Sequence, residues 1–552
     1  MKTRAEVTPE KLRGGFYTPP PLVSACLERV RERLPEGELR LLEPSAGDGA
    51  FVRALGRPEW HRRIAGITAI EPLEIEAEKC RRALADARLP GEVSTTSAIS
   101  WAAESPRTFD AAIGNPPFVR YQFISASDRS AILDLGAALG VGFAGVSNLW
   151  IPVLLAALGR LRPGGAFAFV IPTECLTGCS ATVVRQWLIE QCGEISFDLF
   201  AAGSFPDVLQ EVLILSGRRT AKETPASLPV RVVEHLREGE REWSYNVKDA
   251  ATWTRYLLDP IHLEALEEAQ RLPLTRRLGE LVAFEVSIVT GANDFFSVDD
   301  TTLSAFELER WARPLLPRTR HAPGLVYIDG DREVARAAGS KVWLLDFAVD
   351  KPDPLASPGP REYLALGEAD ELHKRYKCRI REPWYRVPRL VRGELLLSKR
   401  SHHYPRVVVN EARSFTTDTI YRGRMLTADC SPGDLAASFH NSLTLLTAEL
   451  EGRSFGGGVL ELVPSEVARL TTLVPAKAES ALARLDRAAR SGHPDALIEE
   501  TDAFLVGTRA LPTELVPLLQ EARMLLAARR HDRNRRGADD PTTAAVPSAA
   551  AA

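Results

Sequence analysis

A strand, a tight turn and a helix start follow one another at residues 39–55, which read LRLLEPSAGDGAFVRAL. The first five residues predict a buried strand that ends at Glu43, and Ala50–Leu55 predict the beginning of a helix. In the turn between them, Gly47 and Gly49 let the backbone come close to a ligand. The turn lacks the three-glycine pattern of a dinucleotide-binding loop, which cradles a pyrophosphate. It therefore indicates a site for a different small molecule, although an ordinary strand-to-helix turn is the simpler alternative.

Apolar runs and amphipathic segments alternate over the first two hundred residues. This alternation predicts an α/β fold with a doubly wound parallel sheet, whose ligands bind at the carboxyl ends of the strands. Further strands are expected at 64–71, 109–114 and 166–171, and further helices at 73–87 and 150–161.

Glu71 ends the second expected strand, about 20 residues after the glycine turn, where a nucleotide-binding domain places the acid that accepts hydrogen bonds from ribose hydroxyls. S-adenosylmethionine carries a ribose but no pyrophosphate, and its methionine end offers an ammonium and a carboxylate. Glu43 is suited to the ammonium, and the amides of the glycine turn to the carboxylate. A solvated Glu71 at a helix start is the alternative interpretation.

Gly114 is followed by Asn115, Pro116, Pro117 and Phe118, directly after the third expected strand. The two prolines fix the backbone and remove two amide donors. The Asn115 side-chain amide and the carbonyl that follows it then offer two acceptors to one amino group. Adenine N6 needs such a pair, because accepting both of its N–H bonds localises a lone pair that is otherwise delocalised into the ring. Phe118 offers a flat face for an extruded base, or else is a core residue beside a stiff turn.

With these motifs the sequence resembles the amino (N6-adenine) DNA methyltransferases of type II restriction-modification systems. The order of its motifs resembles the gamma-order, Eco57I/TaqI-like group, whose members combine a class I S-adenosylmethionine-dependent methyltransferase domain with a target recognition domain. The resemblance covers 14–215 well and the rest loosely. It implies cofactor contacts from Tyr17, Thr18, Glu43, Ala46, Gly47, Gly49, Phe51 and Glu71, and base contacts from Asn115, Pro116, Pro117, Phe118 and Phe205.

The sequence departs from this family at one position. The family usually has an acid after its third strand that binds the adenine amino group of the cofactor. Here the corresponding stretch, 96–101, contains no acid. Ser97 or a backbone carbonyl is the expected replacement, and cofactor affinity is expected to be lower.

The composition changes along the chain and predicts several parts. A strand-rich, irregular region without β-α alternation follows the catalytic part, then helices, then a low-complexity tail. The expected parts are a catalytic domain at 1–222, a connector at 223–277, a DNA target recognition domain at 278–475, a C-terminal helical segment at 476–533 and a disordered tail at 534–552.

Basic and aromatic residues are interleaved within the expected recognition domain, which suits phosphate contact and base stacking. For any single residue a solvated charged face is the better interpretation, but the cluster as a whole favours DNA contact. His402 and His403 follow it without the carboxylate or cysteine spacing of a metal site, so no metal is expected. The predicted DNA-binding residues are Arg375, Lys377, Arg379, Arg381, Arg386, Lys399 and Arg400.

The bulk composition is that of a globular protein with 45% hydrophobic and 26% charged residues among 552. The net charge of -4 limits any basic surface to a local patch. Seven scattered cysteines indicate reduced thiols and hence a cytoplasmic protein. Residues 135–159 carry no charge, but their glycines and Pro152 favour a buried loop and helix over a membrane span.

The leading hypothesis is a monomeric, site-specific methyltransferase that uses S-adenosylmethionine and double-stranded DNA and flips an adenine out of the duplex. It would be the modification half of a restriction-modification pair, with a cognate endonuclease as its genetic partner. Three alternatives remain open at this point. They are methylation of cytosine N4, methylation of ribosomal RNA or protein glutamine, and a non-catalytic DNA-binding role on the same fold.

Overall fold

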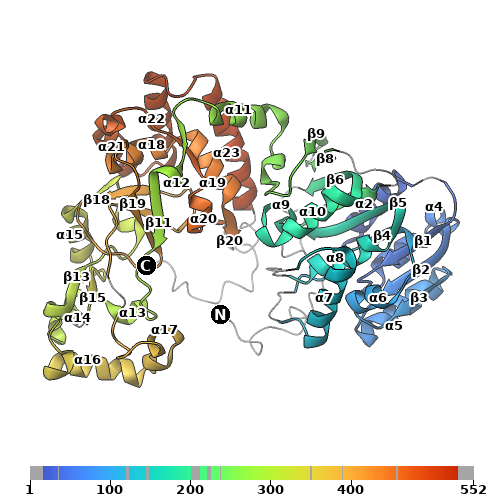
Figure 1. Ribbon diagram of the computed structural model, residues 1–552, viewed down its shortest axis with the longest axis horizontal. Helices are drawn as coiled ribbons and strands as arrows, with labels where there is room; N and C mark the ends of the chain where they lie inside the picture. Colours follow the sequence, from blue (N-terminus) through green and yellow to red (C-terminus); the bar gives the residue numbers. More distant parts are fainter. Residues whose placement is uncertain are drawn as a thin grey trace. The chain divides into compact units, whose positions relative to one another are not determined.

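The computed structural model describes residues 17–34, 36–119, 123–143, 148–200, 212–220, 226–236, 238–348, 351–387, 390–455 and 458–532. The chain forms two compact units, Met1–Pro260 and Ile261–Ala552. Each unit has its own sheets and its own core (Figure 1).

The first unit is built on a nine-stranded sheet with the order β3-β2-β1-β4-β5-β7-β6-β8-β9. Strands β3, β2, β1, β4 and β5 are parallel, and β7 runs antiparallel between β5 and β6. This arrangement confirms the predicted doubly wound α/β fold. The strands are β1 (Leu39–Glu43), β2 (Ile64–Ile70), β3 (Gly91–Ser94), β4 (Phe109–Gly114), β5 (Leu161–Pro172), β6 (Cys192–Phe200), β7 (Val212–Arg219), β8 (Leu228–His235) and β9 (Glu240–Val247).

Strands β8 and β9 lie within the residues that the sequence assigned to a connector. Strand β8 pairs with β6 in parallel and β9 pairs with β8 antiparallel, so both extend the same sheet. The compact unit accordingly runs to Pro260 rather than to residue 222.

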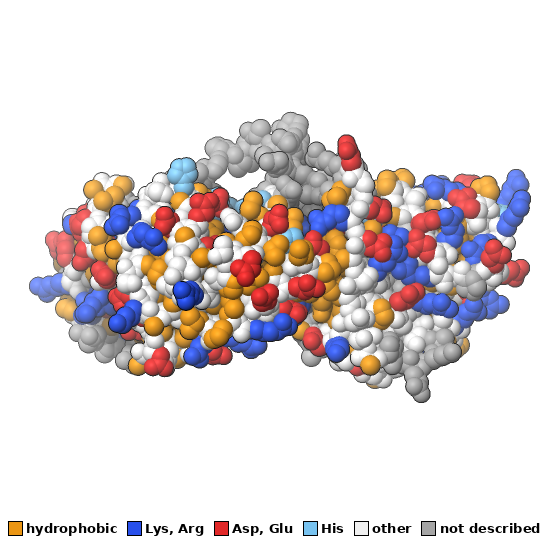
Figure 2. Space-filling view, turned by 90° about the horizontal axis from the view of Figure 1, so that it is seen from above, with side chains coloured by type: hydrophobic (Ala, Val, Ile, Leu, Met, Phe, Trp, Pro, Cys, Tyr) orange, Lys and Arg blue, Asp and Glu red, His pale blue; other side chains and the backbone are white. Residues whose placement is uncertain are grey.

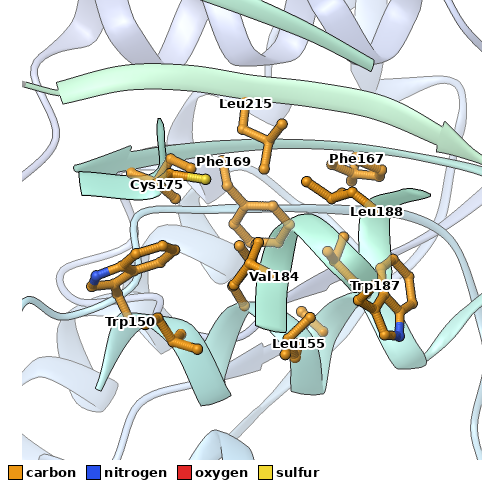
Figure 3. Packing of buried hydrophobic residues seen from close by; sticks show 14 of the residues in the cluster. Trp150, Leu155, Phe167, Phe169, Cys175, Val184, Trp187, Leu188 and Leu215 are labelled. Atoms are coloured by element: carbon orange, nitrogen blue, oxygen red, sulfur yellow. The ribbon is translucent and has the colours of Figure 1, made fainter. Parts of the chain in front are cut away.

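Helices cover both faces of the sheet and bury two separate apolar clusters. Figure 3 shows the first cluster, in which Phe169 and Leu215 of the sheet face Val184 and Leu188 of α10, with Trp150 of α8 beside them. The helices of this unit are α2 (Pro20–Arg31), α3 (Ala50–Leu55), α4 (Pro58–His61), α5 (Glu74–Asp86), α6 (Ala98–Glu104), α7 (Ala126–Leu139), α8 (Trp150–Gly159), α9 (Glu174–Thr177) and α10 (Thr182–Gln191).

The uncharged stretch at 135–159 spans the end of α7 and the whole of α8. Helix α8 packs against the sheet, and all its residues from Trp150 to Leu158 are buried. Among the residues that the structure describes, no helix is long and apolar enough to cross a membrane.

The second unit combines short strands with helices throughout residues 278–475, where the sequence analysis expected a strand-rich domain with helices only after it. Its largest sheet has five strands in the order β11-β19-β16-β18-β14, and smaller sheets are formed by β12-β15-β13, β17-β21-β20 and β10-β22. The strands are β10 (Thr275–Arg277), β11 (Val282–Val286), β12 (Ser297–Val298), β13 (Ala312–Pro314), β14 (Val326–Tyr327), β15 (Trp343–Leu345), β16 (Leu395–Ser398), β17 (Arg400–Ser401), β18 (Val407–Asn410), β19 (Ile420–Met425), β20 (Arg453–Phe455), β21 (Val459–Glu461) and β22 (Thr471–Leu473).

The C-terminal helices pack into this second unit. Arg530 of α23 is buried, forms a 2.7 Å ion pair with Glu449 of α19 and donates hydrogen bonds to the carbonyls of His402 and His403. The helices of the unit are α11 (Pro260–Gln270), α12 (Leu278–Leu281), α13 (Asn293–Phe296), α14 (Asp300–Ala305), α15 (Asp329–Ala337), α16 (Pro358–Ala369), α17 (Tyr376–Arg379), α18 (Pro432–Phe439), α19 (Ser442–Glu451), α20 (Pro464–Val467), α21 (Leu482–Arg490), α22 (Pro494–Gly507) and α23 (Leu515–Asp532).

A buried ionic network ties α2 to strands β6 and β8. Asp198 of β6 accepts hydrogen bonds from Arg29 Nη2 at 2.6 Å and from His235 Nε2 at 2.8 Å, and His235 Nδ1 lies 2.7 Å from Glu240. The hydrogen bond to Asp198 raises the pKa of His235. Burial alone would raise the pKa of Asp198, but the bonds from His235 and Arg29 outweigh it and lower that pKa.

We expect this network to make the stability of the first unit depend on pH above neutrality. Because the folded pKa of His235 is raised, its stabilisation is complete below the unfolded value of about 6.5 and is lost as pH rises through the folded value. His235→Gln should flatten the fall in unfolding free energy as pH rises above about 6.5, measured by denaturant titration. The matched control is His61→Gln, at an exposed histidine of the same unit. An unchanged pH slope in His235→Gln would contradict the role of the network.

Candidate functional site

Three loops meet at the carboxyl edge of the parallel strands. Strand β1 pairs with β2 on one side and with β4 on the other. Glu43 is the last residue of β1, and Glu71 and Asn115 directly follow β2 and β4. The strand ends therefore lie side by side, where a doubly wound sheet binds its ligands.

The two glycines of the first loop have different roles. Gly47 and Gly49 both have positive φ angles, +52° and +85°. A Cβ atom at Gly49 would lie 2.9 Å from Ala83 Cβ and 3.1 Å from Cys80 Cα, because α5 packs directly onto the loop. A Cβ atom at Gly47 would meet nothing within 4 Å. Of these two glycines, only Gly47 has room beside its Cα among the described residues.

Glu71 holds the glycine loop in place. Its carboxylate is almost buried and accepts hydrogen bonds from the amides of Gly47 and Leu73, both at 3.0 Å. Burial raises its pKa, although the two backbone hydrogen bonds act in the opposite direction. An ionised carboxylate accepts about four hydrogen bonds, so Glu71 retains acceptor capacity for the ribose contact predicted from the sequence.

Glu43 is a buried carboxyl group without a partner. Its side chain is 1% exposed, and neither oxygen has a hydrogen-bond partner among the described residues. Burial raises its pKa well above the ordinary value, and the nearby Asp48 and Glu71 add to the shift. A buried acid of this kind is costly to ionise, and a ligand that brings a cation or a hydrogen-bond donor would relieve the cost.

Asn115 is held from two sides by hydroxyl groups. Its Nδ2 donates to Thr18 Oγ1 at 3.2 Å, and Ser45 Oγ donates to the Asn115 carbonyl at 3.0 Å. Its Oδ1 atom is buried and has no hydrogen-bond partner in the described part of the chain. The site thus contains a fixed side-chain acceptor with an unfilled position.

The carbonyls of the catalytic loop are not equivalent. Ser45 already donates to the carbonyl of Asn115, and the amide of Val119 donates to that of Pro117 at 3.1 Å. The Pro116 carbonyl has no such partner among the described residues. The carbonyl of Pro116 is therefore a better second acceptor for an amino group than the carbonyl of Asn115, which was predicted from the sequence.

Several residues expected at the cofactor have other contacts. Phe51 is 2% exposed and belongs to the apolar core, and Ser97 caps α6 by accepting from Ser100 N at 3.2 Å. Tyr17 is 59% exposed, and its hydroxyl bonds to Glu76. These contacts favour structural roles for the three residues.

The amides of the glycine turn also differ from expectation. Those of Ala46, Gly47 and Gly49 donate to Ile70 O, Glu71 Oε2 and Ala46 O at 2.9, 3.0 and 2.9 Å. Because each already has an internal acceptor, these three amides would have to give up a hydrogen bond to bind the carboxylate of a ligand.

Phe118, three residues after Asn115 in the chain, is half-buried and packs against both apolar clusters of the first unit. Its predicted partner Phe205 lies outside the described residues. Ser45 was not among the predicted site residues. Its position directly after Glu43-Pro44, at the end of the strand that pairs with β4, is the one feature of the sequence that places it near Asn115.

The seven predicted DNA-binding residues separate into two groups. Arg381 donates to the carbonyls of Val289 and Thr290, both at 2.6 Å, and Arg386 donates to that of Glu382. Lys399 and Arg400 both pair with Glu461, at 3.5 and 3.1 Å. The remaining three, Arg375, Lys377 and Arg379, are exposed on or beside α17 and form no ion pair with any described residue.

Helix α17 packs closely against the loop that contains Gly291 in the second unit. Gly291 has a φ of +85°, and a Cβ atom there would lie 2.9 Å from Lys377 Cβ and 3.0 Å from Cys378 Sγ. Cys378 is buried beneath the helix, and Arg381 fixes its end to the 289–290 backbone. The three exposed cations therefore lie on or beside a helix that these contacts hold against the second unit.

Charges elsewhere are mixed. On the face seen in Figure 2, basic and acidic side chains are interspersed rather than gathered into one continuous patch. Within the described ranges, no group of three or more histidine, cysteine, aspartate or glutamate side chains is arranged to hold a metal ion.

Two family models match the chain. The Eco57I restriction-modification methylase matches residues 73–202, and the C-terminal domain of type II methyltransferase M.Eco57I matches residues 250–506. The type II methyltransferase M.AccI of Acinetobacter calcoaceticus is 21% identical over 478 residues, covering 82% of this chain and 84% of that protein.

Solved structures also resemble the chain at low identity. The type IIL restriction-modification enzyme MmeI, solved in complex with DNA, is 13% identical with a TM-score of 0.47, covering 91% of this chain and 73% of its own. The type IIG restriction endonuclease BpuSI is 12% identical with a TM-score of 0.41, covering 96% of this chain and 66% of its own.

Glu43→Gln should stabilise the ligand-free protein at neutral pH, because it removes a buried acid that has no partner. The raised folded pKa means that ionising Glu43 destabilises the protein increasingly as pH rises above the unfolded value of about 4.5. We expect a gain of about 1–3 kcal/mol at pH 7, shrinking towards pH 5, in denaturant titrations.

Glu71→Gln provides the matched control, because Glu71 accepts two backbone hydrogen bonds and its amide variant should be less stable than the parent. A Glu43→Gln protein that is also destabilised at pH 7 would show that the Glu43 carboxylate has a partner in the folded protein.

Proposed function

We propose that this chain, which belongs to the Eco57I family of type II restriction-modification methyltransferases, methylates the N6 amino group of adenine within a short sequence of double-stranded DNA. The family and the doubly wound first unit make it a DNA methyltransferase that takes its methyl group from S-adenosylmethionine. The choice of adenine N6 rests on the geometry around Asn115. Its action as a monomer beside a cognate endonuclease is part of the same proposal.

The residues at the strand ends fit the proposed cofactor. S-adenosylmethionine supplies a methyl group activated on a sulfonium and carries an ammonium, a carboxylate and a ribose. The unpartnered Glu43 would hold the ammonium and become ionised at neutral pH. Glu71 would accept from the ribose with its remaining lone pairs, and no described atom crowds the Cα of Gly47 beside it.

The catalytic loop would act by accepting hydrogen bonds. Asn115 Oδ1 and the Pro116 carbonyl each accept one N–H of the amino group, which makes the nitrogen more pyramidal and localises its lone pair. The nitrogen then forms its new bond to the methyl carbon as the carbon–sulfur bond breaks, and its surplus proton passes to water. No strong base is needed, because orientation and preorganised acceptors supply the catalysis.

The main support for adenine N6 as the methylated atom is the side chain of Asn115. The Oδ1 atom of Asn115 is buried and has no hydrogen-bond partner among the residues that the structure describes, while its Nδ2 donates to Thr18. A buried acceptor left unfilled costs about 1–3 kcal/mol, and an amino group in the site satisfies it. Phe118 at its side offers a face for a base that has left the duplex.

Contact with DNA is assigned to the three exposed cations at α17. Arg375, Lys377 and Arg379 form no ion pair among the described residues, whereas Lys399 and Arg400 share Glu461. Tyr376 lies 64% exposed between them and offers a stacking surface. Phosphate binding releases counterions most effectively where the cation has no protein partner to give up.

The reaction is tested by methyl transfer from labelled S-adenosylmethionine to bacterial DNA that lacks adenine methylation, followed by nucleoside analysis. We expect N6-methyladenine at one short sequence. Asn115→Ala should lower turnover by about 100-fold or more while the cofactor Kd stays nearly unchanged. Methyl on cytosine N4 would overturn the choice of adenine, and transfer only to RNA or protein would overturn the proposal as a whole.

Removing the exposed cations should weaken DNA binding and its dependence on salt. For the triple variant Arg375→Ala, Lys377→Ala, Arg379→Ala we expect the slope of log K against log salt to fall by about 1 per lost contact. The control is Lys399→Ala with Arg400→Ala, which removes cations already paired with Glu461. Equal losses in the two variants, measured by fluorescence anisotropy, would remove α17 from the interface.

A further inference from the structure

Two hydroxyl groups from separate segments converge on Asn115. Thr18 precedes α2, and Ser45 lies in the glycine loop after β1. Thr18 Oγ1 accepts from the side-chain amide at 3.2 Å, and Ser45 Oγ donates to the main-chain carbonyl at 3.0 Å. One contact therefore restrains the side chain of Asn115 and the other restrains its backbone.

The Thr18 contact differs from the role implied by family resemblance. That resemblance gives the threonine of this segment a contact to the methionine part of the cofactor. Here its hydroxyl oxygen lies against Asn115 Nδ2, and the neighbouring Tyr17 hydroxyl bonds to Glu76 on the surface of α5. With Nδ2 engaged, the carboxamide leaves Oδ1 as the group available to an incoming donor.

The Ser45 contact joins the cofactor loop to the catalytic loop. Gly114 makes the close approach possible, because a Cβ atom there would touch Pro44 Cδ at 3.4 Å and Ser45 Oγ at 3.5 Å. Gly114 also has a φ of +157°. Ser45 follows Glu43 by only two residues, so a shift of the loop on cofactor binding would reach the Asn115 carbonyl directly.

We propose that Thr18 and Ser45 are positioning residues that fix the orientation of Asn115 for the amino group, and that Ser45 couples cofactor binding to that orientation. This inference rests on the proposed function of Asn115. Neither hydroxyl touches the base. Each hydroxyl restricts the conformations of Asn115, so less conformational entropy is lost when Asn115 binds the amino group.

The test separates turnover from cofactor binding. In Thr18→Val, which removes the hydroxyl at nearly constant volume, we expect kcat to fall about tenfold while the Kd of S-adenosylmethionine changes less than about threefold. Thr18→Ser should restore most of kcat, because it returns the hydroxyl. Ser45→Ala should lower kcat similarly, and the pair Thr18→Val, Ser45→Ala should lose less than the product of the single losses.

Thr108→Val is the matched control, because Thr108 is exposed and precedes β4, at the opposite end of the strand that carries Asn115. It should leave kcat and Kd unchanged. Thermal unfolding of each variant identifies any that fails to fold, in which case Thr18→Ala replaces Thr18→Val and Ser45→Gly replaces Ser45→Ala.

Two outcomes would overturn the inference. A Thr18→Val protein whose Kd for the cofactor rises tenfold or more and whose kcat recovers at saturating cofactor would place Thr18 at the cofactor instead. Unchanged kcat in both single variants would leave Asn115 positioned by other contacts. Failure of the proposed function looks different, because the parent protein itself would then make no N6-methyladenine.

Discussion

The parallel pairing of β1 with β2 and β4 is the constraint on which the site depends. It places the residues after three strands at one edge, so groups distant in sequence become neighbours without a dedicated scaffold. Helix α5 then packs against Gly49, where only a glycine leaves room, and this contact fixes the turn that carries Gly47. Glu71 completes the arrangement by accepting from the Gly47 amide.

Two buried polar groups at this edge of the sheet lack hydrogen-bond partners among the described residues. Within the described part of the chain, Glu43 and the Oδ1 atom of Asn115 are buried acceptors without hydrogen-bond partners, and desolvating both lowers the stability of the folded protein. Such groups are uncommon in native proteins and call for an explanation. Their separate requirements, a cationic or donor group at one and an amino group at the other, match the two substrates of an amino-methyltransferase. Under the proposed function, binding of both substrates would satisfy both groups and offset the stability that their burial costs the free protein.

Much of this was predictable from local sequence, and the remainder was not for identifiable reasons. The strand ends at Glu43, Glu71 and Asn115 follow from apolar runs, which report burial directly. Hydrogen-bond partners depend on contacts between distant segments, so the Thr18 contact to Asn115 and the Glu461 pairing of Arg400 had no local signal. The sequence also did not show that β8 and β9 join the sheet, because a polar stretch separates them from β7.

The most direct test of the Asn115 assignment is a thermodynamic cycle on DNA binding, once the methylated sequence is known. S-adenosylhomocysteine, which has no methyl group to transfer, replaces the cofactor so that the target base stays unmodified. Duplexes with adenine or with purine, which lacks the amino group, at the target are bound to the parent protein and to Asn115→Ala. Weakened base pairing affects both proteins equally, so the ratio of the two affinity ratios reports the Asn115–amino contact alone. The account predicts a coupling of about 1–3 kcal/mol, lost in the variant. Identical affinity ratios for the two proteins would contradict it.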